Sequence, residues 1–320
     1  YTMMDLQIMY QNNVDGSAFD VSEIAMSPKW TTKRTGSPAS FEFEVLKDQA
    51  VIWKHGGIIA VKNGNTGVFY GYVFKITETA NGVVRITAYD QTRYLKNKDT
   101  YVFTGKRADQ ITALIAADFG LKIGTLENTG YVIPSLVEDN KTLFDIILKA
   151  LDLTLINTGQ MFFLWDDYGS LRISSCAGSK LDLLVGDESL ATDYTYTSEI
   201  DSDTYNRIKL VRDNKETGKR DVYLFQDSNN IKFWGTLQYF EKVDEKMNAA
   251  QITERGNNLL TLKNRPQRTF EVEALSDLSV RAGRVLFISF ADIGVKQFFL
   301  IDEASHDLGK ETMSLKLRVI

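Results

Sequence analysis

The chain has 320 residues, which exceeds the usual size of a single hydrophobic core and predicts two or three domains. Its 37 basic and 42 acidic side chains give a formal charge of -5, without the basic excess that general phosphate binding requires, so nucleic acid is not expected as a sequence-specific partner. One cysteine excludes an internal disulfide and a cysteine-cluster metal site, and no apolar run approaches the roughly 20 residues that span a bilayer, so no membrane insertion is expected.

The first region, residues 1–102, is predicted to be mostly β. Residues 41–45 and 83–89 alternate between apolar and polar side chains, and Asn81-Gly82 is a strong hairpin signal. Gly71 interrupts an aromatic strand, which predicts a bulge or a bend of the kind that barrels need at corners. We expect a tube-like β-barrel here.

The second region, residues 103–193, changes to a helical period. Residues 108–119 predict a helix that stops at Gly120, and Asn140 is placed to cap a second helix whose apolar face extends to Leu151. Residues 161–173 then predict a hairpin. The pattern indicates a small α+β domain inserted between two β domains.

The third region, residues 194–320, is predicted to be a second tube-like β-barrel with a helical insertion. A polar turn at 214–219 separates two strand patterns, and residues 249–262 predict a helix that Pro266 closes off. The fold class is therefore mainly β with α+β: two similar barrels plus the inserted domain.

The two predicted barrels share one sequence pattern. Residues 41–48 read FEFEVLKD and residues 270–277 read FEVEALSD. After each copy come a glycine (Gly56 and Gly283), an apolar strand, a turn, an aromatic strand and a final alternating strand. Internal repetition decides how a fold is assigned, and two copies around a long unrelated middle indicate a duplicated β unit rather than a solenoid.

No catalytic motif accompanies this duplication. The two histidines, His55 and His306, lie in or beside predicted turns and are expected to be exposed. The sequence has no Gly-x-Ser-x-Gly elbow, His-Glu-x-x-His, P-loop or dinucleotide fingerprint. We therefore predict no catalytic residue, no cofactor and no metal.

Three further features have a structural and a chemical interpretation. The pairs Asp166-Asp167 and Asp201-x-Asp203 could serve glycoside hydrolysis or calcium binding, but turns favour aspartate and the calcium-loop pattern is incomplete. Cys176 is expected to be a small core or loop residue. Aromatic side chains concentrate in strands, where filling a core is favoured over binding a carbohydrate.

Several segments, in their order along the chain, resemble the baseplate or tail hub proteins of contractile phage tails and phage-tail-like particles, of the XkdQ/YqbQ type. The matching segments are GVFYGYV at 67–73, AYDQTRYL at 88–95, ADQI at 108–111, DTYNRI at 203–208 and KFWG at 232–235. The resemblance spans nearly the whole chain, and it implies a non-enzymatic structural protein built around two tube-like barrels.

The resemblance implies a homotrimer whose six similar barrels match a hexameric tail tube to a trimeric spike. It implies contacts with other baseplate proteins and the tape measure, assembly in the bacterial cytoplasm, and release in a virion or tail-like particle. A mild negative charge would suit a lumen that does not retain DNA. The residues expected at the tube or subunit interface are Phe69, Tyr70, Tyr72, Phe74, Arg85, Thr87, Phe298, Phe299, Lys316 and Arg318.

Two other functions remain open at this point. A peptidoglycan hydrolase would need a carboxylate pair in one cleft, and a carbohydrate-binding tail module would need aromatic side chains that face outward.

Overall fold

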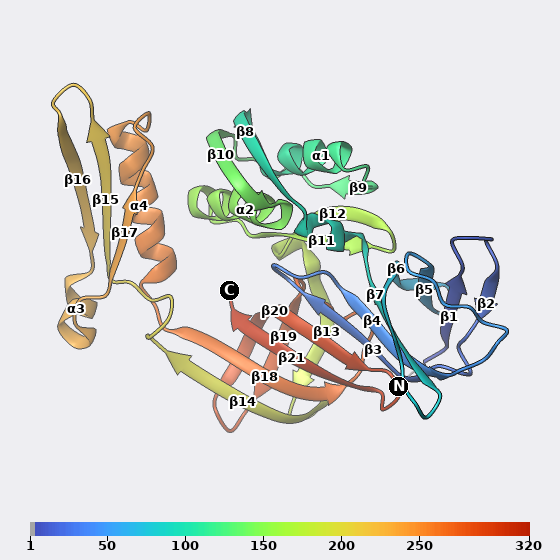
Figure 1. Cartoon of the computed structure of the whole chain (residues 1–320). Helices are drawn as coiled ribbons and strands as arrows, with labels where there is room; N and C mark the ends of the chain where they lie inside the picture. The colour runs from blue at the N-terminus through green and yellow to red at the C-terminus, as the bar shows by residue number, and fades with distance from the viewer. Residues whose placement is uncertain (1–3) are drawn as a thin grey trace.

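The computed structural model describes residues 4–320 of the chain. A large, strongly curved sheet forms the base of the molecule, one α+β unit lies above it, and a second α+β unit stands at one side (Figure 1). The sheet consists of two β units, and each β unit and each α+β unit has its own hydrophobic cluster.

The first β unit has alternating strands whose apolar side faces the first cluster. Phe41, Phe43 and Val45 are buried there, while Glu42 between them is exposed. This is the period of two that a half-buried strand requires. The strands are β1 (Leu6–Gln11), β2 (Ala18–Asp20), β3 (Met26–Lys33), β4 (Ser40–Leu46), β5 (Ile58–Asn63), β6 (Thr66–Glu78) and β7 (Val83–Tyr89).

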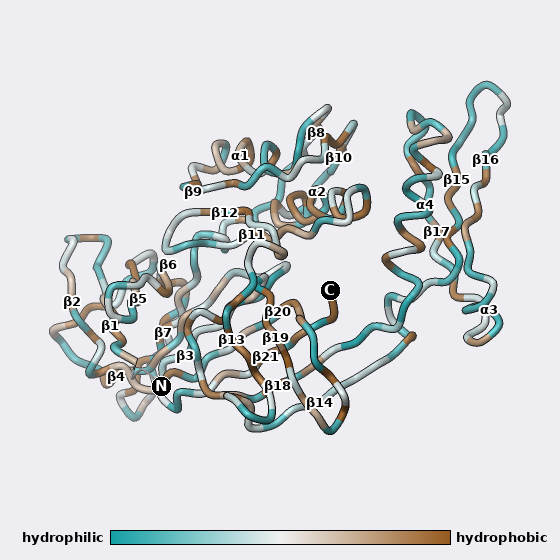
Figure 2. Tube along the Cα trace, turned by 180° about the vertical axis from the view of Figure 1, so that it is seen from behind, coloured by the Kyte–Doolittle hydropathy of each residue, from teal (hydrophilic) through white to brown (hydrophobic). Residues whose placement is uncertain are grey.

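The inserted unit follows directly and is α+β, as predicted from the change of period. Its helix α2 is hydrophobic along most of its length (Figure 2). Thr142, and not Asn140 as predicted, caps this helix, because Thr142 directly precedes it and its hydroxyl accepts from the Asp145 N–H. The elements are η1 (Gln91–Lys96), β8 (Lys98–Lys106), α1 (Ala108–Asp118), β9 (Ile123–Leu126), β10 (Ile133–Thr142), α2 (Leu143–Thr158), β11 (Phe162–Asp167), β12 (Ser170–Ser175) and η2 (Ala177–Ser179).

The second β unit is built around Phe270, Phe299 and Leu315, all fully buried. Its strands are β13 (Lys180–Gly186), β14 (Ala191–Glu199), β18 (Gln267–Leu275), β19 (Val285–Phe290), β20 (Val295–Asp307) and β21 (Thr312–Val319). Strand β13 packs with this unit and β8 with the inserted one, so we propose that the domain boundaries lie near residues 90 and 180 instead of 102 and 193.

The insertion in the second β unit is larger than the single helix that the sequence predicted. It has a three-stranded sheet covered on one face by α4, and its cluster includes Ile156 from α2. Its elements are β15 (Arg207–Asn214), β16 (Lys219–Gln226), α3 (Ser228–Trp234), β17 (Gln238–Lys242) and α4 (Ala249–Lys263).

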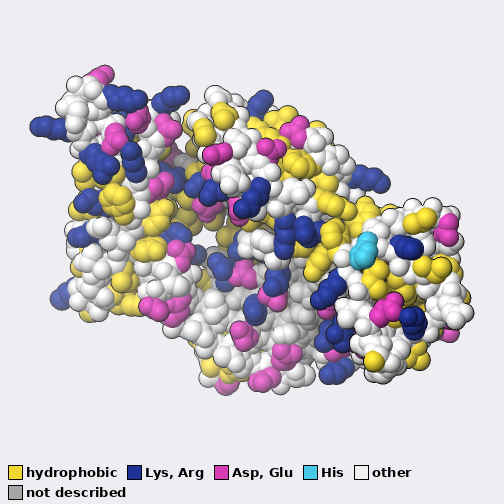
Figure 3. All heavy atoms as spheres, in the orientation of Figure 1, with side chains coloured by type: hydrophobic (Ala, Val, Ile, Leu, Met, Phe, Trp, Pro, Cys, Tyr) yellow, Lys and Arg dark blue, Asp and Glu magenta, His cyan; other side chains and the backbone are white. Residues whose placement is uncertain are grey.

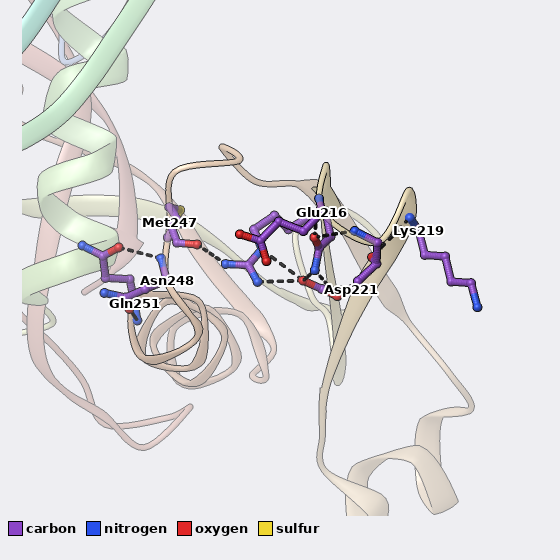
Figure 4. A network of polar contacts seen from close by, with 9 residues as sticks. Glu216, Lys219, Asp221, Met247, Asn248 and Gln251 are labelled. Atoms are coloured by element: carbon purple, nitrogen blue, oxygen red, sulfur yellow. Dashed lines mark hydrogen bonds and ion pairs between the residues drawn. The ribbon is translucent and has the colours of Figure 1, made fainter.

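Polar contacts hold the far end of this insertion together. The Arg212 side chain forms an ion pair with Asp221 (2.6 Å) and donates to the Met247 carbonyl, which joins the β15–β16 hairpin to the segment before α4 (Figure 4). Asn248 and Gln251 form a capping box at the start of that helix. The sequence predicts the hairpin and its polar turn, but it does not predict the contacts of Arg212 with Asp221 and the Met247 carbonyl.

The predicted duplication is present in the hydrogen bonding of the two β units. Strands β4, β5, β6 and β7 pair in the same order as β18, β19, β20 and β21. In both units the sheet has a bulge at the same place, between Val73 and Lys75 of β6 and between Ile301 and Glu303 of β20. The two units differ in the strand beside this motif, because β1 pairs with β5 antiparallel whereas β13 pairs with β19 parallel.

The repeated glycines also have equivalent roles. Gly56 and Gly283 both have positive φ, and their N–H groups donate to the equivalent carbonyls of Val73 and Ile301 at 2.8 Å. Of the bulge or bend predicted at Gly71, the bulge lies elsewhere, between Val73 and Lys75. A Cβ on Gly71 would lie 2.3 Å from the Tyr89 carbonyl oxygen, so the position needs glycine for a close approach of two strands.

The two β units are hydrogen-bonded to each other within one 13-stranded sheet. The joint is the antiparallel pairing of β20 with β3, where Ser305 lies opposite Thr31 and Glu303 opposite Lys33. None of the described helices is long and apolar enough to cross a membrane.

Candidate assembly interface

The large sheet has one polar face. Alternate residues of its strands are exposed on it, and charges of both signs are interspersed over the part formed by β14, β18 and β21 (Figure 3). Cross-strand ion pairs order this face: Arg85 with Glu44 at 2.8 Å, and Glu303 with both Lys316 (3.6 Å) and Lys33 (3.8 Å). A face with balanced, mutually paired charges offers little net attraction for a polyanion.

Four of the predicted interface residues lie on or beside this face. Arg85 is exposed on β7, and Lys316 and Arg318 are exposed on β21, where Arg318 pairs with Asp302. Thr87 lies two residues after Arg85 on β7 but is only 5% exposed. The exposed side chains of Arg85, Lys316 and Arg318 are therefore placed where they can contact another molecule.

Burial removes two of the predicted interface residues. Phe69 is 2% exposed in the first cluster and Phe299 is fully buried in the second β unit. Both fill cores, so neither can contact another subunit. Phe298 remains 37% exposed, with the Lys180 amino group 4.6 Å from its ring centre.

The other three aromatic residues pack against the inserted unit of the same chain. The ring centre of Tyr70 is 5.5 Å from that of Tyr168, and those of Tyr72 and Phe74 are 6.0 and 5.8 Å from that of Tyr94. These half-buried side chains bind the β unit to its neighbour, an arrangement that does not form an outward platform for carbohydrate.

The two histidines have opposite environments. His55 is exposed, as predicted, whereas His306 is fully buried in β20 and the prediction of an exposed loop histidine is wrong. Strand β20 extends to Asp307, so His306 lies in the β20–β3 joint and stacks on Trp30 (5.0 Å between ring centres). The joint buries it because both sides of the ring are covered.

The hydrogen bonds of His306 give it a structural role. Nε2 lies 2.8 Å from the Val280 carbonyl and must donate, so Nδ1 accepts from the Ser276 hydroxyl at 2.6 Å. Burial lowers the pKa of His306 to about 4 and keeps the ring neutral. This serine–histidine contact is enclosed by protein, and neither group faces a substrate-sized space.

A buried polar cluster lies where three units meet. It contains Asp90, Asp166 and Arg281, whose guanidinium lies 4.3 Å from the ring centre of Trp165. Burial, followed by the charge of Asp166, raises the pKa of Asp90 to about 8, while burial lowers the pKa of Arg281 to about 10. No sequence pattern indicates this cluster, because its members are far apart along the chain.

Asp166, the member of the predicted Asp166-Asp167 pair that lies in this cluster, has a structural role and does not form a hydrolytic site. Asp166 accepts from the Gln91 side chain (2.8 Å) and from the Gly169 N–H (2.8 Å), so it orders the hairpin turn as predicted. The adjoining cavity is about 20 Å³, which is room for about one water molecule and far too small for a sugar ring.

The remaining candidate residues also have structural roles. Cys176 is buried, as predicted, and desolvation raises the pKa of its thiol to about 11, which makes the thiolate nucleophile scarce. Asp203 pairs with Lys263 at 2.6 Å. Within residues 4–320, no group of acidic, histidine or cysteine side chains is arranged to hold a metal ion.

A second surface is apolar and lies on the insertion of the second β unit. Helix α4 covers one face of its sheet, and the opposite face carries Val222, Leu224 and Phe240, each more than half exposed. Phe233 of α3 is 77% exposed nearby, and hydrophobic side chains are visible across this unit (Figure 3). Exposed apolar groups of this kind are typical of a surface that binds another protein.

Residues 28–318 match the model of the YqbQ-like family. The chain belongs to this family. It is 32% identical over 303 residues to the phage-like element PBSX protein XkdQ of Bacillus subtilis (strain 168), which covers 91% of each chain.

Solved structures share the fold at low sequence identity. The 43 kDa tail protein of prophage MuSo2 from Shewanella oneidensis matches with a TM-score of 0.72 and 14% identity, over 98% of both chains. The E. coli c3393 protein, described as a component of the type VI secretion system, matches with a TM-score of 0.55 and 8% identity, over 93% of this chain and 73% of its own. The chain therefore belongs to the YqbQ-like family and shares its fold with a prophage tail protein and a type VI secretion component.

Proposed function

We propose that the chain is the hub of a contractile tail or phage-tail-like particle: a homotrimer that joins the hexameric tail tube to the trimeric central spike. The observation that supports this most is the equivalence of the two β units. They share strand order, register and bulge position, and each has a glycine with positive φ at the equivalent place, Gly56 and Gly283. Three chains would present six similar units around one axis, which matches a sixfold tube on one side and a threefold spike on the other.

A ring of this kind requires heterologous contacts. An isologous dimer would pair the same patch of two chains and would not place successive β units around an axis. Because the two β units of one chain are already joined side by side through β3 and β20, repeating that relation is the simplest way to extend the ring.

The two surfaces described above then have different roles. The polar face of the sheet, with Arg85, Lys316 and Arg318, would line or adjoin the lumen, where paired charges let a polyanion pass without sticking. The apolar face of the insertion, which is reached from outside the sheet, would bind another baseplate protein. Tape measure contact, assembly in the bacterial cytoplasm and release within the particle complete this proposal.

The decisive experiment is to determine the copy number of the chain in purified particles by native mass spectrometry or cryo-electron microscopy. We expect three copies between a hexameric tube ring and a trimeric spike. Six copies, or a single copy, would refute the hub.

A cell-wall hydrolase is not favoured, because the adjacent carboxylates Asp166 and Asp167 do not share a cleft: Asp166 lines a cavity with room for about one water, and Asp167 pairs with Arg172 at 2.9 Å. The double variant Asp166→Asn with Asp167→Asn tests this directly. Particles that carry it should keep any lytic activity of the wild type, and loss of lysis by correctly assembled particles would revive the hydrolase.

A further inference from the structure

Because of the internal duplication, β6 is equivalent to β20 and β14 is equivalent to β3. Strands β20 and β3 pair with each other within the chain, whereas β6 and β14 do not. In the second β unit, one edge of β20 pairs first with β19 and then, through residues 303–307, with β3. In the first β unit, the same edge of β6 pairs with β5 up to Tyr72, and residues 75–79 beyond it pair with no strand among residues 4–320 on that side.

The complementary edge belongs to β14. Strand β3 pairs with β4 on one side and β20 on the other, whereas β14, which occupies the equivalent place beside β18, ends the sheet. Trp30 lies opposite Phe41 and Tyr196 lies opposite Phe270, so the two strands also have equivalent registers. The described residues therefore leave two unpaired strand edges, on β14 and on the end of β6, whose registers are complementary but which do not pair with each other.

We infer that residues 196–199 of β14 pair antiparallel with residues 75–78 of β6 in a second copy of this chain, with Thr197 opposite Thr77 and Glu199 opposite Lys75. The register follows from the internal joint, because the shared bulge makes Lys75 equivalent to Glu303 and Thr77 equivalent to Ser305. This inference rests on the proposed trimer and specifies how its subunits are joined.

The side chains at the inferred contacts are complementary. In the internal joint, Lys33 pairs with Glu303 at 3.8 Å. At the inferred joint the charges are exchanged, since Glu199 takes the place of Lys33 and Lys75 takes the place of Glu303. Neither Lys75 nor Glu199 has an ion pair within residues 4–320. The Glu199 carboxylate accepts hydrogen bonds from the Asp201 N–H and from the N–H and hydroxyl of Ser202, but no cation neutralises its charge.

The pair of positions two residues further along the strands repeats the pattern. Thr31 and Ser305 share a hydroxyl hydrogen bond of 3.0 Å, and the equivalent residues Thr197 and Thr77 bring two hydroxyls together again. One position is not copied: Glu78, which pairs with Lys47 at 2.8 Å, replaces His306. The match is therefore strongest over residues 75–77 and 197–199.

Unpaired strand edges favour association with another strand, and proteins normally cover or disrupt them. Each β unit would supply four adjoining strands to the shared sheet: β6, β7, β4 and β3 from one, and β20, β21, β18 and β14 from the other. A heterologous contact of this kind closes into a ring when the rotation allows, and then removes every such edge.

The test is a cysteine pair in the chain assembled with its own tube and spike proteins. In the variant Thr77→Cys with Thr197→Cys, oxidation should link neighbouring chains into covalent dimers and trimers, because the hydroxyls at the equivalent internal positions are 3.0 Å apart. The matched control, Thr77→Cys with Thr195→Cys, displaces one thiol by two residues along the strand and should link poorly. The native Cys176 is buried and does not compete.

A charge exchange gives an independent readout. Lys75→Glu should lower the yield of assembled particles several-fold, and adding Glu199→Lys in the same chain should restore it. If particles contain three copies but T77C/T197C does not link, or the control links equally well, the inferred joint is wrong and the hub stands. If particles do not contain three copies, the hub itself is wrong.

Discussion

We expect acid to weaken the second β unit through His306. Its ring is fully buried, donates to the Val280 carbonyl, accepts from Ser276 and stacks on Trp30, an arrangement that accommodates only the neutral form. Its pKa is lowered from 6.5 to about 4 in the folded chain. Between these values the unfolded chain binds a proton that the folded chain does not, so the free energy of unfolding falls as pH falls.

The size of the loss in unfolding free energy follows from the difference between the unfolded and folded pKa values of His306. About pH 5 lies roughly 1.5 units below the unfolded pKa and above the folded one, and each unit is worth about 1.4 kcal/mol, so lowering the pH from about 7 to about 5 should cost about 2 kcal/mol. Below about pH 4 the folded ring also takes up a proton and this contribution stops growing. Urea unfolding followed by hydrogen-exchange mass spectrometry of β18–β21 peptides measures the loss in this unit alone.

The matched variant His306→Gln keeps a side chain that can donate and accept but does not titrate in this range. It should lose stability at neutral pH yet show less pH dependence than the wild type. The exposed histidine offers the control, since His55→Gln should leave the pH dependence of the second β unit unchanged. Equal pH dependence in His306→Gln and the wild type would refute the reasoning.

Three further substitutions test the packing. Gly71→Ala should cost about 2 kcal/mol or more by thermal unfolding, because the added Cβ meets the Tyr89 carbonyl oxygen at 2.3 Å. Phe270→Ala should cost about 3–5 kcal/mol in the second β unit, seen as lost hydrogen-exchange protection there. Arg281→Met should cost about 3 kcal/mol in urea above about pH 8, where the buried Asp90 carboxylate loses its proton and needs the cation, and less at neutral pH, where Asp90 is largely protonated.

The sequence predicted the features that local patterns encode. The duplicated strands were found because spacing, glycine and alternation recur together, and the inserted α+β unit was found from its change of period. The start of α2 was misplaced by two residues because Asn140 and Thr142 are both good caps, and the length of β10 decides between them.

Long-range pairing explains what the sequence did not predict. Nothing near His306 indicates that Trp30 will cover it, because the β20–β3 register joins residues more than 270 positions apart. The aromatic residues Phe69 and Tyr70 are adjacent and look alike in the sequence, yet one is in the core and the other contacts Tyr168 of the inserted unit. A strand pattern gives a period, and the tertiary fold decides what lies on each face.

The pattern of similarity and difference between the two β units argues for an adaptor. The units agree in the strands that build the shared sheet and differ in what is attached to it: β1 runs antiparallel to β5 where β13 runs parallel to β19, the inserted unit follows only the first copy, and the α4 insertion interrupts only the second. In a ring of three such chains, the sheet would repeat six times while each attached unit appears three times. A duplicated chain can thus hold sixfold geometry in its sheet and threefold geometry around it, which a hexamer of single units could not do, because its six attachments would be identical.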